Sequence, residues 1–330
     1  MAAAGRLAPG LAAFKPKRRS PTAELAPAAP PAIAAPITPR SEGEARQLSP
    51  ETHRHRSVAA RRLVINADDF GRSPAINEAI IRAHREGVLT TASLMVNGGA
   101  FAEAVALAKE HPQLGVGLHL TLACGKATCS QLEIPDLITA AHDFSDSPVA
   151  AGFRYYFNQG LRLQLAREIG AQFAKFKATG LVLDHVNGHL NFHLHPTVLS
   201  ILLARHTEWD IRHFRLTDDL FGLSGQLTRG RLGYRASHAF IFRILSRRAR
   251  QRLVRSGIRF TEHVFGLLQN ENVDEDYILK LLPRLPRGDS ELYSHPSLTE
   301  FRHEFEALIS PRVKARLAEL RIEPIRYQDL

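Results

Sequence analysis

The chain reads Leu63-Val64-Ile65-Asn66-Ala67-Asp68-Asp69-Phe70-Gly71 where a short apolar run meets two adjacent carboxylates and a glycine. The β-branched residues predict a buried strand, and Ser73-Pro74 just beyond it is typical of a helix N-terminus. A turn and a helix cap account for Ser73-Pro74, but they give no reason for two carboxylates side by side. In parallel α/β folds, functional residues collect at the carboxyl ends of strands. Asp68 and Asp69 are therefore candidate site residues.

Neighbouring side chains on a strand point to opposite faces, so two adjacent carboxylates reach one centre only where the backbone turns. Phe70-Gly71 is the expected position of that turn, because glycine adopts backbone conformations that other residues avoid. The two aspartates can then serve the same site in different roles.

Outward from this stretch, short β-branched runs alternate with longer amphipathic stretches. The alternation predicts an α/β fold, in which parallel strands form a (β/α) barrel or a related sheet with helices packed outside. The expected strands are residues 63–67, 91–96, 114–122, 181–186, 212–216, 259–265 and 291–293. The expected helices are residues 73–86, 100–110, 163–177 and 197–205.

Single histidines lie on two of these strands or at their exits. His119 lies among leucines in residues 114–122, where a lone histidine is more often a satisfied core residue than a ligand. His295 follows the strand expected at 291–293, and a proline comes directly after it. Each histidine alone is a weak signal, but strand ends that all carry metal-type ligands predict a common site.

A histidine-rich segment follows the strand expected at 181–186. Residues 184–196 hold four of the sixteen histidines of the chain. His189, His193 and His195 share one face if the segment is extended, and such clustering is typical of metal binding. This segment is the richest source of candidate ligands in the chain.

One carboxylate and two imidazoles can hold a divalent cation and leave positions open for water and substrate. Such an ion lowers the pKa of water and polarises a carbonyl group. A second carboxylate can then accept a proton, and a histidine opposite can protonate a leaving amine. The set predicts hydrolysis of an amide. It suits Zn²⁺, Mn²⁺, Co²⁺ or Mg²⁺.

The motifs also resemble a known family. Residues 67–71 (Ala-Asp-Asp-Phe-Gly), 117–120 (Gly-Leu-His-Leu), 188–196 and 291–296 (Glu-Leu-Tyr-Ser-His-Pro) are similar to those of the YdjC-like carbohydrate deacetylases. The resemblance covers about residues 61–330. It implies an irregular (β/α) barrel of the YdjC/NodB-like deacetylase type that removes acetyl groups from N-acetylated sugars and uses one divalent metal ion, Mg²⁺ or Zn²⁺.

By this resemblance Asp68 is the general base and His295 the general acid, while Asp69, His119 and His189 hold the metal. The candidate substrate-binding residues are Asn66, Phe70 and His193. The family pattern Asp-Ser-His-x-His-x-His is replaced here at residues 187–193, where Asn187 stands for the acid and Asn191 for the middle histidine. His193 is consequently a fallback ligand.

The sequences of residues 184–189 and 262–266 most resemble those of the hopanoid-biosynthesis-associated branch of the family, HpnK. This resemblance implies the N-acetylglucosaminyl group of a hopanoid lipid as substrate. Residues 235–259 interleave apolar residues with eight arginines. A basic amphipathic helix can lie on an anionic membrane surface, and it can equally be a barrel helix with its apolar face in the core. The two interpretations are compatible, so we expect that residues 235–259 can also make peripheral contact with a membrane.

Residues 1–58 are rich in Ala, Pro and Arg, and we expect them to form a disordered tail ahead of a domain at 59–330. Eleven Lys and Arg and four Glu give residues 1–62 a formal charge of +7, out of +10 for the whole chain. Most of the basic excess therefore lies in these first 62 residues, and no nucleic-acid motif is evident. A nucleic-acid-binding protein would also leave the histidines unexplained. A metal-dependent phosphoester hydrolase is the alternative enzyme, and it would be favoured by two closely spaced metals.

The apolar runs are too short to cross a bilayer, and residues 1–20 lack the apolar core of a secretory signal. The two cysteines, Cys124 and Cys129, are too few for a disulfide framework. These features favour a cytoplasmic protein, with any membrane contact at the inner surface.

Overall fold

The computed structural model describes residues 60–227 and 232–330. The expected tail, residues 1–58, lies outside the described residues. Seven parallel strands form one sheet in the order β4-β3-β2-β1-β6-β5, and β7 also pairs with β1. The strands are β1 (Arg61–Phe70), β2 (Thr91–Leu94), β3 (Gly115–Leu120), β4 (Val186–Gly188), β5 (His263–Phe265), β6 (Gly288–Ser294) and β7 (Ile322–Ile325).

Strand β1 is the centre of the sheet. All residues from Leu63 to Phe70 are buried, as expected for a parallel strand that is covered on both faces. Its pairing with β6 runs from Arg61–Gly288 to Ala67–Ser294, while β2 and β7 share its other edge. Because all these strands are parallel, their carboxyl ends lie at one rim of the sheet.

The sheet curls toward closure through residues that form only isolated bridges. Val186 of β4 bridges Phe214, and His213 bridges Arg259, which precedes β5. The strand expected at 212–216 is therefore reduced to these bridges, and the strand expected at 259–265 shrinks to β5. The strand expected at 181–186 is displaced, since β4 begins only at Val186. The irregular (β/α) barrel is confirmed, and its irregularity lies at these three segments.

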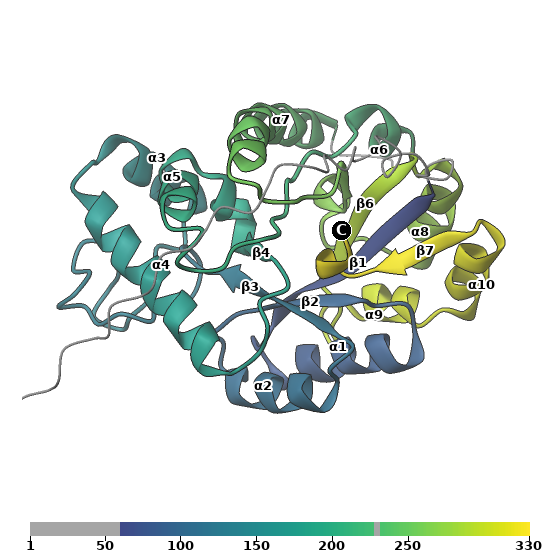
Figure 1. Ribbon diagram of the computed structural model, residues 1–330, viewed down its shortest axis with the longest axis horizontal. Coiled ribbons are helices and arrows are strands. Elements are labelled where there is room, and N and C mark those ends of the chain that lie inside the picture. Colours follow the sequence, from purple (N-terminus) through teal and green to yellow (C-terminus); the bar gives the residue numbers. More distant parts are fainter. Residues whose placement is uncertain (1–59, 228–231) are drawn as a thin grey trace, which may run out of the picture. The chain divides into compact units, whose positions relative to one another are not determined.

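Helices lie outside the sheet (Figure 1). The four expected helices are α1 (Pro74–Glu86), α2 (Phe101–Glu110), α4 (Leu161–Ala178) and α5 (Pro196–Ala204). The basic stretch at 235–259 falls mostly within α7 (Leu232–Arg255). Helices that the sequence did not predict are α3 (Pro148–Phe157), α6 (Phe221–Leu227), α8 (Glu275–Leu281), α9 (Arg302–Leu308) and α10 (Pro311–Glu319). Among the described helices, none combines the length and apolar character needed to cross a bilayer.

Candidate active site

The register of the strands brings the expected site residues to one rim. Ala67 of β1 pairs with Ser294 of β6, so Asp68 and His295 are the next residues along two neighbouring strands. On the other side, His119 of β3 pairs with Asn187 of β4, and His189 follows two residues later. Residues far apart in sequence thus meet because parallel strands end together.

Asp69 is the point at which β1 departs from regular strand geometry. Its φ of 66° lies in the left-handed region that non-glycine residues seldom adopt. The pairing of β1 with β2 also shifts register between Ala67 and Phe70. The change of direction therefore occurs at Asp69 itself, one residue before the expected turn at Phe70-Gly71. This local distortion lets Asp68 and Asp69 both face the site.

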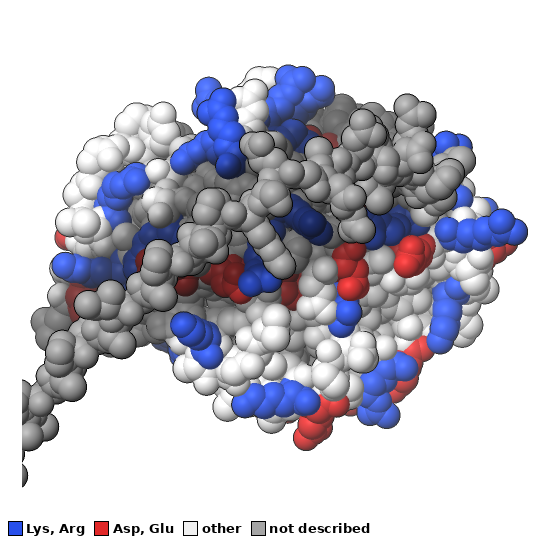
Figure 2. Space-filling model, in the orientation of Figure 1, with Lys and Arg blue, Asp and Glu red and all other residues white. Residues whose placement is uncertain are grey.

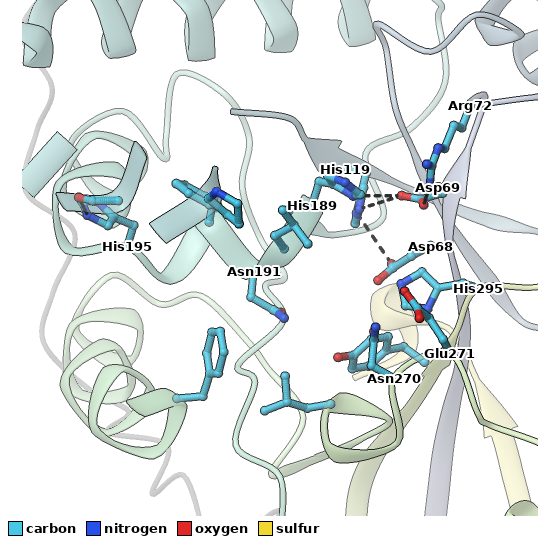
Figure 3. Close-up of a pocket in the computed structure, with 18 of the residues that line it drawn as sticks. Asp68, Asp69, Arg72, His119, His189, Asn191, His195, Asn270, Glu271 and His295 are labelled. Carbon is cyan, nitrogen blue, oxygen red and sulfur yellow. Dashed lines mark hydrogen bonds and ion pairs between the residues drawn. The ribbon is translucent and has the colours of Figure 1, made fainter. Parts of the chain in front are cut away.

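Three side chains gather around one point (Figure 3). Asp69 Oδ1 lies 3.3 Å from His119 Nε2 and 3.2 Å from His189 Nδ1. The three donor atoms lie within 4.8 Å of one another, and in the described part of the chain this is the only such group of three ligands. His119 Nε2 is buried without a hydrogen-bond partner. The donors fit a divalent ion, and they are the residues expected from the sequence.

Asp68 is held by a buried arginine. Arg215 donates to Asp68 Oδ2 at 2.6 Å and to Asp68 Oδ1 at 3.1 Å, and it also donates to Glu291. Burial alone would raise the pKa of Asp68, but the charges of Arg215 and His119 and the hydrogen bonds from Arg215 together outweigh it and hold that pKa well below its usual range. Asp68 therefore stays ionised at the rim of the sheet.

The ligand residues influence one another's ionisation. Burial would raise the pKa of Asp69, but the close approach of the His119 and His189 rings lowers it well below its usual value. Burial would lower the pKa of His119, whereas Asp68 and Asp69 raise it above its usual value. Two carboxylates thus make this corner of the protein attractive to a cation.

A pocket of about 520 Å³ opens over this group. Asp68, Asp69, His119, His189 and His295 all line it. Its remaining wall includes apolar side chains of α3 and α7 together with Phe192, Leu267, Tyr293 and Phe301. The structure therefore brings both expected catalytic residues and all three expected metal ligands to one cavity, with one apolar side.

The three expected substrate-binding residues lie behind the pocket and do not line it. Asn66 is buried and donates to Asp68 and Ser93, and Phe70 is fully buried in the core. His193 Nε2 lies 3.1 Å from the carbonyl oxygen of Arg215. Burial lowers the pKa of His193 to about 3. The side chains of Asn66, Phe70 and His193 therefore contact other residues of the protein and not the pocket in which a substrate would bind.

The histidine-rich segment is not extended, contrary to the sequence interpretation. Residues His189–Leu194 form a 3₁₀ turn in which Leu190 and Asn191 have φ of 53° and 58°. The turn separates the three histidines that an extended segment would place on one face. His189 faces the ligand group, His193 enters the core, and His195 lines a different wall of the pocket.

Two arginines of the site were missed from the sequence. Arg215 is 1% exposed although it carries a charge, and Arg72 pairs with Asp69 Oδ2 at 2.8 Å. The available signal for Arg215 was an arginine within the strand expected at 212–216, since a buried charge needs a partner. Nothing in the sequence near residue 215 indicated that the partner would be Asp68.

Comparisons with known proteins agree with this geometry. Residues 62–319 match the family described as YdjC-like protein. A carbohydrate deacetylase of Brevibacillus brevis is 41% identical over 150 residues, which are 46% of this chain and 57% of that protein. A carbohydrate deacetylase of Geobacillus stearothermophilus is 37% identical over 158 residues, which are 47% of this chain and 60% of that protein. The matched segment thus spans little more than half the length of these curated relatives.

One solved structure shares the fold. It is a protein from Enterococcus faecalis described as a cellobiose-phosphate cleavage protein, with a TM-score of 0.64 and 24% sequence identity. The similarity covers 82% of this chain and 99% of that chain. The match to the family extends over most of the chain and includes the ligand residues Asp69, His119 and His189. The chain therefore belongs to the YdjC-like protein family.

Proposed function

We propose that this chain is a metal-dependent hydrolase that removes the acetyl group from an N-acetylated sugar. The observation that carries the proposal is the pocket in which Asp69, His119 and His189 converge beside Asp68 and His295. The carbohydrate deacetylases that match about half of the chain support the same activity.

Asp69, His119 and His189 are the residues that would hold the ion, Mg²⁺ or Zn²⁺. Two imidazoles and one carboxylate are common zinc ligands, whereas Mg²⁺ prefers oxygen donors. When bound, such an ion acts as a Lewis acid that activates water and polarises the acetyl carbonyl group. The partnerless Nε2 of His119 is the donor atom that most clearly requires it.

The protein residues account for the proton transfers. In the proposed reaction, water attacks the carbonyl carbon of the acetamide while Asp68 accepts its proton. The C–N bond then breaks, His295 gives a proton to the sugar nitrogen, and acetate and a free amine are released. Arg215 keeps Asp68 ionised and aimed at the pocket, which prepares it as the base.

Acetate release tests the proposal directly. The full chain, stripped of metal and reloaded, is incubated with an N-acetylated chito-oligosaccharide. We expect acetate and free amine in equal amounts, and we expect chelation or His119→Ala to abolish both. A metal-loaded protein that releases no acetate from oligosaccharide, sugar nucleotide or glycolipid would contradict the proposal.

For the substrate, we propose a glycolipid, the N-acetylglucosaminyl group of a hopanoid lipid. The similarity of residues 184–189 and 262–266 to the hopanoid-associated branch supports this choice. The apolar wall formed by Ile241, Phe242 and Leu245 of α7 supports it as well, because a lipid next to the sugar would contact that wall. The test compares acetate release from a glycolipid with release from a chito-oligosaccharide of the same sugar. An equal or higher kcat/KM for the oligosaccharide would exclude this preference.

We further propose that α7 contacts an anionic membrane surface. Phe240, Ile241 and Ile244 are exposed on α7, and Arg243 and Arg247 are exposed between and beside them. Lys and Arg side chains gather on the surface over this helix (Figure 2). Exposed apolar residues next to basic ones are the pattern of a helix that lies in a membrane interface.

Vesicle binding tests this contact. The full chain is sedimented with vesicles of phosphatidylcholine, with and without phosphatidylglycerol. We expect binding only to the anionic vesicles and a large loss in the variant Phe240→Ser/Ile244→Ser. The matched control is Val182→Ser, which removes an exposed apolar residue elsewhere. Equal binding of all three proteins would refute a role for α7.

A further inference from the structure

Three buried side chains form a line behind the pocket. Asp184, His185 and Ser93 are each 1% exposed or less, and none of them lines the pocket. Asp184 Oδ2 lies 2.9 Å from His185 Nδ1, and His185 Nε2 lies 2.9 Å from Ser93 Oγ. Because the Ser93 hydroxyl is fully buried, it cannot act as a nucleophile on a substrate. Any functional effect of this line must pass through its neighbours.

Strand β3 is shaped to accept two of these side chains. A Cβ atom at Gly115 would lie 2.8 Å from Asp184 Cγ, and one at Gly117 would lie 2.5 Å from His185 Cε1. Both separations are shorter than carbon atoms tolerate. Tyr327 covers the His185 ring, with 4.5 Å between the ring centroids. The glycines and the tyrosine thus confine His185 to one position.

The Asp184 carboxylate sets the direction of the hydrogen bonds. An ionised carboxylate only accepts, so His185 carries its hydrogen on Nδ1. In the neutral imidazole, Nε2 is then an acceptor, and the Ser93 hydroxyl donates to it. With its hydrogen used in this way, Ser93 Oγ accepts hydrogen bonds from neighbouring donors, while Asn66 Oδ1, which lies 3.2 Å from it, accepts instead from Thr91 Oγ1 at 2.9 Å.

Two amides provide those hydrogen bonds. Asn66 Nδ2 lies 3.1 Å from Ser93 Oγ and 2.9 Å from Asp68 Oδ1. Asn187 Nδ2 lies 2.8 Å from Ser93 Oγ and 3.0 Å from Asp68 Oδ1. Each NH₂ group therefore bridges the serine and the carboxylate. This arrangement fixes which side of each amide faces Asp68.

The orientation of Asn187 reaches the ligand group. With its nitrogen turned toward Ser93, Asn187 presents Oδ1 to His119 Nδ1 at 2.7 Å. His119 then carries its hydrogen on Nδ1 and leaves Nε2 free, on the side of Asp69 and His189. A histidine can bind a metal only through a nitrogen without hydrogen, and its second nitrogen is usually held by a fixed acceptor.

We propose that Asp184, His185 and Ser93 form a positioning relay that orients Asn187 and thereby holds His119 in the tautomer that offers Nε2 to the metal. The inference rests on the proposed function for the identity of the ligand group. The same relay orients Asn66 and Asn187, whose amides donate to Asp68. The relay residues contact neither substrate nor metal.

The test uses His185→Phe and Ser93→Ala in the full chain. Phenylalanine keeps a ring against Tyr327 but removes both hydrogen bonds of His185, and alanine removes the serine hydroxyl. Ser246→Ala is the matched control, because Ser246 is also fully buried and donates one hydrogen bond, to the carbonyl oxygen of Thr217. The first measurement is the ¹⁵N NMR spectrum of the histidine rings in the metal-free protein, at a pH high enough for the His119 ring to be neutral, with His119 assigned by comparison with His119→Gln.

The expected result is a single Nδ1–H tautomer of His119 in the wild type and the control, and a mixture of tautomers in both relay variants. The dissociation constant of Zn²⁺, measured by chelator competition, should rise by about 10- to 100-fold in both variants. The double variant should bind no more weakly than the weaker single variant, because both changes interrupt one chain.

Each outcome separates the relay from the proposed function. Folded relay variants with an unchanged His119 tautomer and unchanged Zn²⁺ affinity would overturn the relay. Additive losses in the double variant would also overturn it. A wild-type protein that binds no divalent ion would contradict the proposed function instead, while the tautomer measurement would still decide the relay. If His185→Phe does not fold, Ser93→Ala decides alone.

Discussion

At the scale of single residues, Asp68 and Asp69 are neighbours in sequence with different surroundings. Asp68 is bound by Arg215, Asn66 and Asn187, so both of its oxygens face hydrogen-bond donors. Asp69, with its φ of 66°, faces two histidines and the half-exposed Arg72. Substitutions of the two residues should therefore fail in different ways.

We expect Asp69→Asn to weaken metal binding, because it removes a charged ligand atom, and excess metal should restore part of the activity. Asp68→Asn should keep the metal and lower kcat by about 10²- to 10⁴-fold, the usual contribution of a general base. Metal content and acetate release are measured on the same samples. Loss of the metal from Asp68→Asn would show that the two roles are assigned wrongly.

The burial of His193 should make the free energy of unfolding depend on pH. Burial lowers the pKa of His193 to about 3, below the value of about 6.5 for an exposed histidine. The unfolded chain therefore gains a proton as the pH falls below about 6.5, while folded His193 stays neutral, so the free energy of unfolding should decrease. One such group contributes about 1.4 kcal/mol per pH unit.

The measurement is urea unfolding of the metal-free protein from about pH 7.5 to about pH 5. This range brackets the pKa of an exposed histidine. His193→Gln, which can still donate to the carbonyl oxygen of Arg215, should show a shallower decline than the wild type. The buried His195 and His213 have lowered pKa values too, so some decline should remain. Identical slopes for both proteins would exclude His193 as a source.

At the scale of elements, β3 combines a ligand with the glycines that make room for buried polar groups. Gly117 and His119 share one face of the strand, since side chains alternate along it. We expect Gly117→Ala to push the His185 ring aside, because the new Cβ would lie 2.5 Å from Cε1. Overpacking of this kind typically destabilises by about 1–3 kcal/mol.

The free energy of unfolding of Gly117→Ala is compared with that of Gly222→Ala. A Cβ at Gly222 meets nothing within 4 Å, and this glycine lies in the short helix α6. Gly222→Ala should leave stability unchanged or raise it slightly, since alanine favours helix. If the two substitutions have the same effect, close packing at Gly117 is not a constraint on the fold.

At the scale of the whole molecule, the ligand group needs only elements within the described residues. Its strands β1, β3 and β4 begin at Arg61 and end at Gly188. We therefore expect a chain that starts at residue 59 to keep both metal binding and acetate release. It would also lose half of the formal positive charge, because residues 1–58 contribute +5 of the +10.

Limited proteolysis of the full chain and assays of the truncated chain test the expectation. Cleavage of the full chain should stop near Arg61, and the truncated chain should unfold at the same temperature as the full chain. A truncated chain that cannot fold, or that loses metal affinity, would show that residues 1–58 contribute to the domain.

The sequence by itself determined the α/β alternation and four of the residues that meet at the pocket, Asp68, Asp69, His119 and His295. These features are local. They can be recognised without knowledge of distant contacts, from β-branched runs, Ser-Pro helix starts and candidate ligands at strand ends. Ser147-Pro148 and Ser310-Pro311 carry the same helix signal as Ser73-Pro74, and they do begin α3 and α10. Those two helices could have been predicted.

Only the tertiary structure decided which histidine of residues 189–195 faces the ligand group and which buried charge supports Asp68. The left-handed turn at Leu190 and Asn191 rotates His193 into the core, whereas an extended segment would have kept it on one face with His189. Arg215 meets Asp68 from 147 residues away. The direction of the hydrogen bonds from Asp184 to His119 likewise depends on side chains of three strands and their connections. Such contacts arise from packing between distant segments, and no local sequence pattern encodes them.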